Sequence, residues 1–240
     1  MDALPEATLV IVLAVVLSFF AYRKHLMSPA ATVAAAISAC IIGFCGGIWW
    51  EVTMILFPAF AFVATKAHFE EKKAMGLQEG NRGCRGILNI LGVILFPTIV
   101  SVIYHLTDTA DLELTIAFMS ALAVSTADTF SSELGVLDPK VYMITTGRPC
   151  ERGMNGGVSR YGMLVSAIGA GAFAFLGYLI IFQELSFLML IPWAAGILGN
   201  VIDSVEGAVF ENRGLMSKYT VNTSSSMIGA MIGFLIAMLF

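Results

Sequence analysis

The chain has 240 residues, of which 58% are hydrophobic and only 12% charged, and its mean hydropathy is +0.86. Soluble globular chains carry about 25% charged residues, so this composition excludes an ordinary soluble domain. It indicates an all-α polytopic membrane protein, in which the placement of charge matters more than the net charge of −4.

Apolar segments long enough to cross a bilayer recur along the whole chain. A spanning helix needs about 20 mostly apolar residues. The eight segments that meet this criterion are about 6–22, 30–49, 51–66, 86–106, 111–130, 159–182, 185–209 and 221–240. We therefore predict a transmembrane helical bundle with one integral membrane domain over 1–240. Residues 1–50 form two N-terminal spans in this prediction, and 60–240 carry the motifs described below.

Basic residues occur only in alternate loops. All 13 Lys and Arg residues follow the first, third, fifth or seventh predicted span, and the other loops hold acids such as Glu51, Asp108 and Glu184. Loops rich in Lys and Arg stay in the cytoplasm, so both termini are expected to be extracytoplasmic. The protein is expected in the cell membrane. Its two longest loops, about 67–85 and 131–158, would then face the cytoplasm.

The first polar motif is "ATKAHFEEKKAMGLQEGNRGCRGILNILG", residues 64–92. Lys66 ends one predicted span, and Arg85 and Asn89 lie four residues apart, on one face of the next. One interpretation is that Lys66 and Arg85 bind phosphate oxygens, while Asn89 contacts a metal ion or phosphate inside the bundle. The alternative is a solvated basic loop, which we favour for the "EEKK" segment at 70–73.

Carboxylates and hydroxyls follow the uncharged fifth span in "ADTFSSELG", residues 127–135. If the helix continues, these side chains form a polar face near the cytoplasmic boundary. Asp128, Ser131 and Glu133, with no His or Cys nearby, make an oxygen-only ligand set, which suits Mg²⁺ rather than zinc. The alternative is helix capping with hydrogen-bonded packing.

A Gly-rich segment, "TTGRPCERGMNGGVSRYG" at 145–162, precedes the sixth span. Gly156 and Gly157 stand just before Ser159, a plausible helix cap, and Arg148 lies nearby. A helix start with free N–H groups and a positive dipole end suits phosphate. The segment is neither a P-loop nor a dinucleotide-binding motif, and an ordinary Gly-rich loop before a helix is the alternative.

The fourth motif, "GILGNVIDSVEGAVFENRGLMSKYTVNTSSS" at 196–226, puts acids inside or near the end of the seventh span. Asp203 and Glu206 are three residues apart, and Asn222 begins the last span. A shared Mg²⁺ or a nearby Lys would keep such a buried carboxylate charged. The histidines are scattered, which argues against a His-based metal site or triad: His25, His68 and His105.

Taken in order, the four motifs resemble those of the plant phytyl-phosphate kinase family and its prokaryotic integral-membrane relatives. The "ADTF" and "GNVIDS" elements are more distantly similar to polyprenol kinases and CTP-dependent phosphatidate cytidylyltransferases. The resemblance runs from about residue 60 to the C-terminus and departs from the family pattern at Met154 and Glu206. It implies a Mg²⁺-dependent kinase that moves a phosphoryl group from a nucleoside triphosphate, expected to be CTP, to an isoprenoid monophosphate such as phytyl or geranylgeranyl phosphate.

The resemblance also assigns roles to individual residues. It implies that Mg²⁺ is held by Asp128, Glu133 and Asp203, which with Lys66 form the expected catalytic set. The expected nucleotide- and phosphate-binding residues are Asn89, Arg85, Ser131, Arg148, Gly156, Gly157, Ser159 and Asn222. The prenyl tail is expected between the helices, in contact with membrane lipid, and no nucleic-acid partner is expected. An acceptor phosphate is already a good nucleophile, so no general base is required.

Two other functions remain open at this point. A CDP-lipid-forming cytidylyltransferase would use the same charges but release pyrophosphate. A lipid or small-solute transporter would place polar groups near mid-membrane and show an inverted repeat. No such repeat is visible, and the polar residues crowd one predicted face of the membrane.

Overall fold

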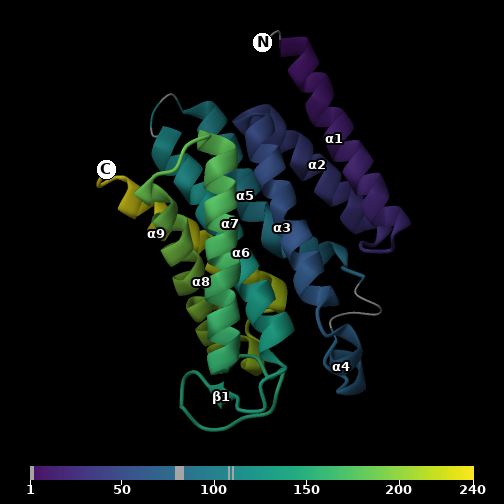
Figure 1. Ribbon diagram of the computed structural model, residues 1–240, viewed down its shortest axis with the longest axis vertical. Helices are drawn as coiled ribbons and strands as arrows, with labels where there is room; N and C mark the ends of the chain where they lie inside the picture. The colour runs from purple at the N-terminus through teal and green to yellow at the C-terminus, as the bar shows by residue number, and fades with distance from the viewer. Residues whose placement is uncertain (1–2, 79–83, 108, 110) are drawn as a thin grey trace.

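The computed structural model describes the chain except for residues 1–2, 79–83, 108 and 110 (Figure 1). Arg82 and Asp108, which the predicted topology counted, therefore lie outside the described residues. Within the described part, eight helices are long and apolar enough to cross a membrane: α1 (Ala3–Arg23), α2 (Pro29–Gly46), α3 (Ile48–Lys66), α5 (Ile87–Leu106), α6 (Asp111–Gly135), α7 (Arg160–Phe182), α8 (Leu190–Val209) and α9 (Lys218–Ala237). The prediction of an all-α bundle of eight spans is confirmed.

The short elements are a helix, a small ribbon and two 3₁₀ turns. They are α4 (Phe69–Ala74), β1 (Tyr142–Met143), β2 (Gly157–Val158), η1 (Phe187–Met189) and η2 (Glu211–Arg213). Strands β1 and β2 pair antiparallel, with Tyr142 opposite Val158. The ribbon and α4 lie at the end of the bundle away from the N-terminus (Figure 1).

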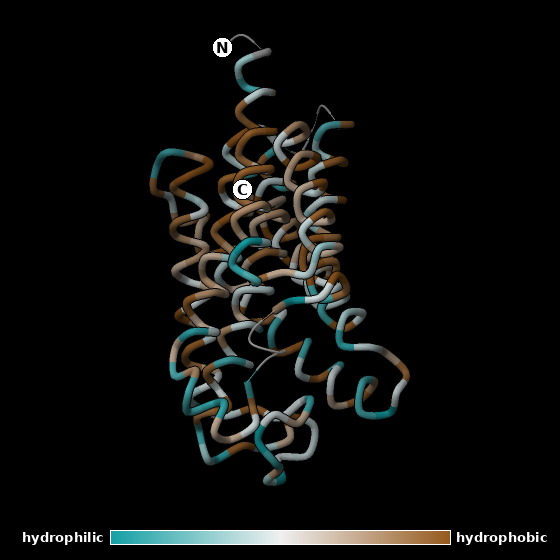
Figure 2. Tube along the Cα trace, turned by 90° about the vertical axis from the view of Figure 1, so that its right-hand side faces the viewer, coloured by the Kyte–Doolittle hydropathy of each residue, from teal (hydrophilic) through white to brown (hydrophobic). Residues whose placement is uncertain are grey.

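This end of the bundle, called the basic end below, consists of the described segments 23–28, 66–78, 84–86, 136–159 and 210–217. Spanning helices traverse the bundle in alternating directions, so these segments share one side and both termini lie toward the other; α4 and the 136–159 loop extend furthest from the N-terminus, and the turn between α1 and α2 lies about half-way along the view (Figure 1). Hydrophilic residues concentrate in the loops of the basic end, while the helices above them are mainly hydrophobic (Figure 2).

Helix α6 is the centre of the bundle. In its apolar window 83% of residues are buried, against 11–44% for the other spans, and it packs against α3, α5, α7, α8 and α9. Its Thr126 and Thr129 hydroxyls each donate a hydrogen bond of 2.8 Å to the carbonyl four residues earlier, so they need no partner from another helix. Because α6 is central, the polar residues at its C-terminal end are enclosed by neighbouring helices.

Glycines allow α8 and α9 to approach α6 closely. A Cβ atom added at Gly199 of α8 or at Gly229 of α9 would overlap the side chain of Val124. One at Gly233 would overlap Ser120. Small residues at such crossings are the usual means by which membrane helices pack, since lipid supplies little hydrophobic force between them.

We expect Gly229→Leu to lower the stability of the bundle by about 1–3 kcal/mol, because the new side chain overfills the crossing of α9 and α6. Thermal unfolding of the detergent-solubilised protein measures the effect. Met231→Leu is the matched control, because Met231 lies on the same helix and is 53% exposed. Equal unfolding temperatures for the two variants would contradict the packing argument.

Two helix ends differ from the prediction in ways that matter for function. Helix α6 continues to Gly135, which packs against Gly162 of α7, so "ADTFSSELG" is helical throughout. Helix α9 begins at Lys218, three residues earlier than predicted, because Ser217 accepts a hydrogen bond of 3.3 Å from the Thr220 N–H and caps the helix.

Candidate functional site

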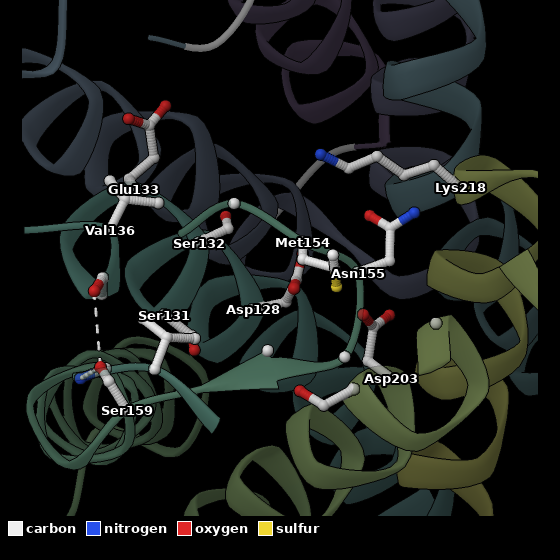
Figure 3. A pocket seen from close by; sticks show the side chains of 18 of the residues that line it. Asp128, Ser131, Ser132, Glu133, Val136, Met154, Asn155, Ser159, Asp203 and Lys218 are labelled. Carbon is white, nitrogen blue, oxygen red and sulfur yellow. Dashed lines mark hydrogen bonds between the residues drawn. The ribbon is translucent and has the colours of Figure 1, made fainter. Parts of the chain in front are cut away.

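A cavity of about 240 Å³ lies at the basic end between α6, α8, α9 and the 136–159 loop (Figure 3). Residues whose side chains bear oxygen line much of it: Asp128, Ser131, Ser132, Glu133, Asn155, Ser159, Asp203, Ser204, Glu211 and Asn222. Among the described residues, no Cys or His side chain lines this cavity. It thus brings together the second and fourth polar motifs and part of the third.

The carboxylates of Asp128 and Asp203 both point into the cavity, from α6 and α8 respectively (Figure 3). They are close enough to repel each other electrostatically. Asp203 accepts a hydrogen bond of 2.8 Å from Ser225 on α9, which fixes its carboxylate between the two helices. The neighbouring Ser224 hydroxyl of α9 likewise donates a hydrogen bond of 2.8 Å to the carboxylate of Glu206 on α8. Glu206, one of the two departures from the family pattern, thus joins α8 to α9.

Glu133 does not join Asp128 and Asp203, although all three were predicted to hold one metal ion. It lies five residues after Asp128, which on an α-helix is a rotation of roughly 140°. Its carboxylate points away from the cavity (Figure 3) and accepts hydrogen bonds from Thr65 at 2.7 Å and from Lys72 at 2.5 Å. Among the described residues, no three His, Cys, Asp or Glu side chains are grouped to hold a metal ion.

Lys72 is the partner that the sequence interpretation missed. The "EEKK" segment was expected to be solvated, yet the Lys72 side chain is 0% exposed and that of Glu133 only 3%. The ammonium group also donates to the backbone carbonyls of Ala64 and Thr65, at 3.1 and 3.0 Å. This ion pair attaches α4 to the end of α6. A buried Lys among exposed acids and bases has no local sequence signal that could have identified it.

Lys218 is a second residue that the site prediction missed. It lines the cavity from the first turn of α9, one turn before Asn222, and it interacts electrostatically with Asp203. Figure 3 shows its side chain reaching over the cavity near Asn155. The spacing of Lys218 and Asn222, four residues apart on one helix face, is the signal that could have identified it.

Gly156 and Gly157 bring the loop against α8. Gly156 has a φ of +77°, which favours glycine, and a Cβ atom there would overlap Ala208. Ser159 caps α7, accepting from the Gly162 N–H at 2.9 Å and donating to the Gly135 carbonyl at 3.4 Å. These predicted phosphate-binding residues line the cavity, and their contacts to α6, α7 and α8 determine its shape.

Asp138 fastens the start of the same loop. Its carboxylate accepts hydrogen bonds from the Lys140 N–H at 2.9 Å and from the Tyr161 N–H at 3.4 Å. The Lys140 contact is the main cause that lowers the pKa of Asp138 below its ordinary value, so the group is ionised at neutral pH.

The remaining predicted residues lie elsewhere. Lys66 and Arg85 line a separate cavity, described below. Asn89 is half-buried on α5, and Arg148 is exposed in the 136–159 loop; neither is among the described residues that line the polar cavity. Met154, the other departure from the family pattern, lines the cavity rim and is 42% exposed.

Comparison with known families identifies the chain. The family described as integral membrane protein DUF92 matches residues 12–236, which includes most of the two N-terminal spans and all four motifs. The chain belongs to this family. It is therefore an integral membrane protein, as the composition predicted.

Three relatives illustrate the breadth of the DUF92 family. An uncharacterized membrane protein of Methanocaldococcus jannaschii is 29% identical over 237 residues, covering 98% of this chain and 96% of that protein. Protein PGR of Arabidopsis thaliana is 27% identical, with coverages of 90% and 84%. Protein VTE6, chloroplastic, of Arabidopsis thaliana is 28% identical, with coverages of 73% and 54%.

These prokaryotic and plant relatives confirm the resemblance at the level of the family. No solved structure matches the chain.

Proposed function

We propose that this protein is a membrane-embedded kinase that transfers the terminal phosphoryl group of a nucleoside triphosphate, with CTP the expected donor, to an isoprenoid monophosphate. The observation that supports it best is the pair of carboxylates, Asp128 and Asp203, facing each other in an oxygen-lined cavity. The cavity lies at the basic end, which the positive-inside rule assigns to the cytoplasm, where nucleotides are available. The ordered match of four motifs to the phytyl-phosphate kinase family supports the same reaction.

The cavity's donor set fits Mg²⁺. Two carboxylates that repel each other favour a cation between them, and only oxygen donors accompany them. In nucleotide-using enzymes Mg²⁺ is commonly bound by one or two carboxylates together with substrate phosphates and water, so a third protein carboxylate is not required. Asp128 and Asp203 would hold the ion, which neutralises charge on the nucleotide phosphates.

The protein's own residues then position and stabilise the phosphates. Lys218 and Asn222 reach the cavity from α9 and would bind phosphate oxygens, while Ser131 of α6 and Asn155 of the 136–159 loop add hydrogen-bonding groups. An acceptor phosphate oxygen bonds to the terminal phosphorus as the bond from that phosphorus to the bridging oxygen breaks. A nucleoside diphosphate leaves with the bonding electrons.

We expect Lys218→Gln to raise the KM for the nucleotide about 10-fold, because a charged hydrogen bond to phosphate is lost. Initial rates at varied nucleotide concentration measure this value. Lys140→Gln is the control, because Lys140 is exposed and is not among the residues that line the cavity. An unchanged nucleotide KM in Lys218→Gln would remove this residue from the phosphate site.

The function itself is tested by a product assay. Purified protein is incubated with Mg²⁺, phytyl or geranylgeranyl monophosphate, and CTP, ATP, GTP or UTP in turn. The proposal predicts isoprenoid diphosphate and the matching nucleoside diphosphate in equal amounts. Absence of diphosphate product with every nucleotide and chain length would refute it.

A further inference from the structure

A second cavity, of about 130 Å³, lies at the basic end beside α1, α2, α3, α4 and α5. Its walls are mainly apolar and include Met54, Phe57, Ala61, Ile90 and Ile94. We call it the apolar cavity. It contrasts with the oxygen-lined cavity, because its walls offer almost no group that could bind a sugar, a base or a metal ion.

Two cations stand among these apolar walls. Lys66 and Arg85 line the apolar cavity, and no Asp or Glu is found with them among the described lining residues. The Lys66 ammonium group lies 5.3 Å from the centre of the Phe69 ring and 5.8 Å from that of Phe62, both of which also line the cavity. Phe62 is 46% exposed on the outer surface of α3, where lipid is expected.

Arg85 is held in place by its backbone. Its N–H donates to the Leu26 carbonyl at 2.9 Å, and its own carbonyl accepts from the Ser28 N–H at 3.0 Å. The segment before α5 is thereby attached to the turn between α1 and α2, and Leu26 and Met27 of that turn complete the cavity wall. The backbone of Arg85 is thus held at the cavity by main-chain contacts on both sides.

One hydrogen bond links a residue of each cavity. Thr65 lines the apolar cavity, and its hydroxyl donates to the carboxylate of Glu133, a residue that also lines the oxygen-lined cavity. A ligand bound by Lys66 and Arg85 would therefore lie at the same end of the bundle as the proposed nucleotide site, with Thr65 and Glu133 between them. This common placement favours a substrate over a lipid that merely fills a groove.

We propose that the apolar cavity binds the acceptor of the reaction, with the carbons next to its phosphate on the apolar walls and the phosphate oxygens on Lys66 and Arg85. This inference rests on the proposed kinase function. A cavity of about 150 Å³ accommodates benzene, so the space suits the first part of an isoprenoid chain. The remaining carbons would extend past Phe62 into lipid. An anionic head on an apolar chain is the ligand that complements two cations over an apolar cavity.

The direct test is photolabelling without nucleotide. The full-length protein in nanodiscs receives an isoprenoid monophosphate that carries a photoreactive group in its first isoprene unit. We expect label on the cavity-lining parts of α3 and α5, displaced by unlabelled isoprenoid monophosphate but not by phosphatidylglycerol at the same concentration. Label spread over lipid-facing surfaces, or equal displacement by phosphatidylglycerol, would overturn the inference.

Variants make the test specific. Lys66→Gln and Arg85→Gln should each reduce labelling about 10-fold, because each removes a charged contact to phosphate. Ala61→Phe should reduce it by filling the cavity, and size-exclusion chromatography checks that this buried substitution still folds. Lys73→Gln is the control, because Lys73 is exposed on α4 and lines neither cavity. Unchanged labelling in both cation variants would also overturn the inference.

Kinetics separate this inference from the proposed function. In an active enzyme, Lys66→Gln should raise the KM for the acceptor and leave the KM for the nucleotide unchanged. Specific labelling of the apolar cavity without any diphosphate product would refute the kinase reaction but support the lipid-binding site. Diphosphate formation with label placed elsewhere would support the kinase and overturn the assignment of this cavity.

Discussion

Asp128→Asn and Asp203→Asn should each lower the turnover rate at least about 100-fold while the protein remains folded. Each change removes one negative charge and one anionic oxygen from the cavity in which the two carboxylates meet. Asparagine keeps the shape of the side chain, and at position 203 its carbonyl oxygen still accepts from Ser225. The expected loss is therefore one of metal and phosphate binding. Steady-state rates at saturating substrate measure it.

A carboxylate far from the cavity provides the control for both variants. Glu184 is exposed at the opposite end of the bundle, after α7, so Glu184→Gln should retain the wild-type rate. Both Asp variants should also need more Mg²⁺ for their residual activity. A near-normal rate in either variant would remove that carboxylate from the proposed metal site.

Glu133→Gln should lower the free energy of unfolding by about 3–5 kcal/mol, because it leaves the buried Lys72 ammonium without its counterion. The combined variant Lys72→Met with Glu133→Gln should recover much of this loss, since an apolar side chain then replaces the buried charge. Unfolding in denaturant, followed for the solubilised protein, measures both values.

The same pair of variants separates a structural role of Glu133 from the predicted role as a metal ligand. If Glu133 only holds α4 against α6, the folded fraction of Glu133→Gln keeps the wild-type dependence on Mg²⁺ concentration. Unchanged stability together with a higher Mg²⁺ requirement would instead return Glu133 to the metal site, through a movement of its carboxylate that breaks the contact with Lys72.

The spans could be predicted from the sequence because they depend on local hydropathy. The grouping of alternate loops on one side of the bundle could also be predicted, because successive spans run in opposite directions. The end of α6 shows where local reasoning stops. A helix and a loop both allow polar residues at 131–135, and it is the helix that turns Glu133 about 140° away from Asp128. Gly135 packed on Gly162 is a contact between distant segments, which no local pattern reveals.

The residues of the candidate site that carry a local sequence signal could be predicted, and those that depend on long-range packing could not. Asp128 and Asp203 carry a local signal, since a carboxylate at the end of an apolar run needs an explanation. Lys66 and Arg85 were predicted to bind phosphate together, and the structure places both at one cavity, but the position of that cavity apart from the carboxylates depends on how α1 and α2 pack beside α3 and α5. The burial of Lys72 likewise results from the fold of the 66–78 segment against α6.

Transfer of label from the nucleotide tests the central claim most directly. CTP, or whichever nucleotide supports turnover, is labelled either on its terminal phosphate or on its α-phosphate, and the lipid product is analysed. A kinase reaction at this site predicts that only the terminal label appears in the lipid, as isoprenoid diphosphate, and that Asp128→Asn abolishes this transfer. Appearance of the α-phosphate label in the lipid, with release of pyrophosphate, would show nucleotidyl transfer and contradict the proposed kinase reaction.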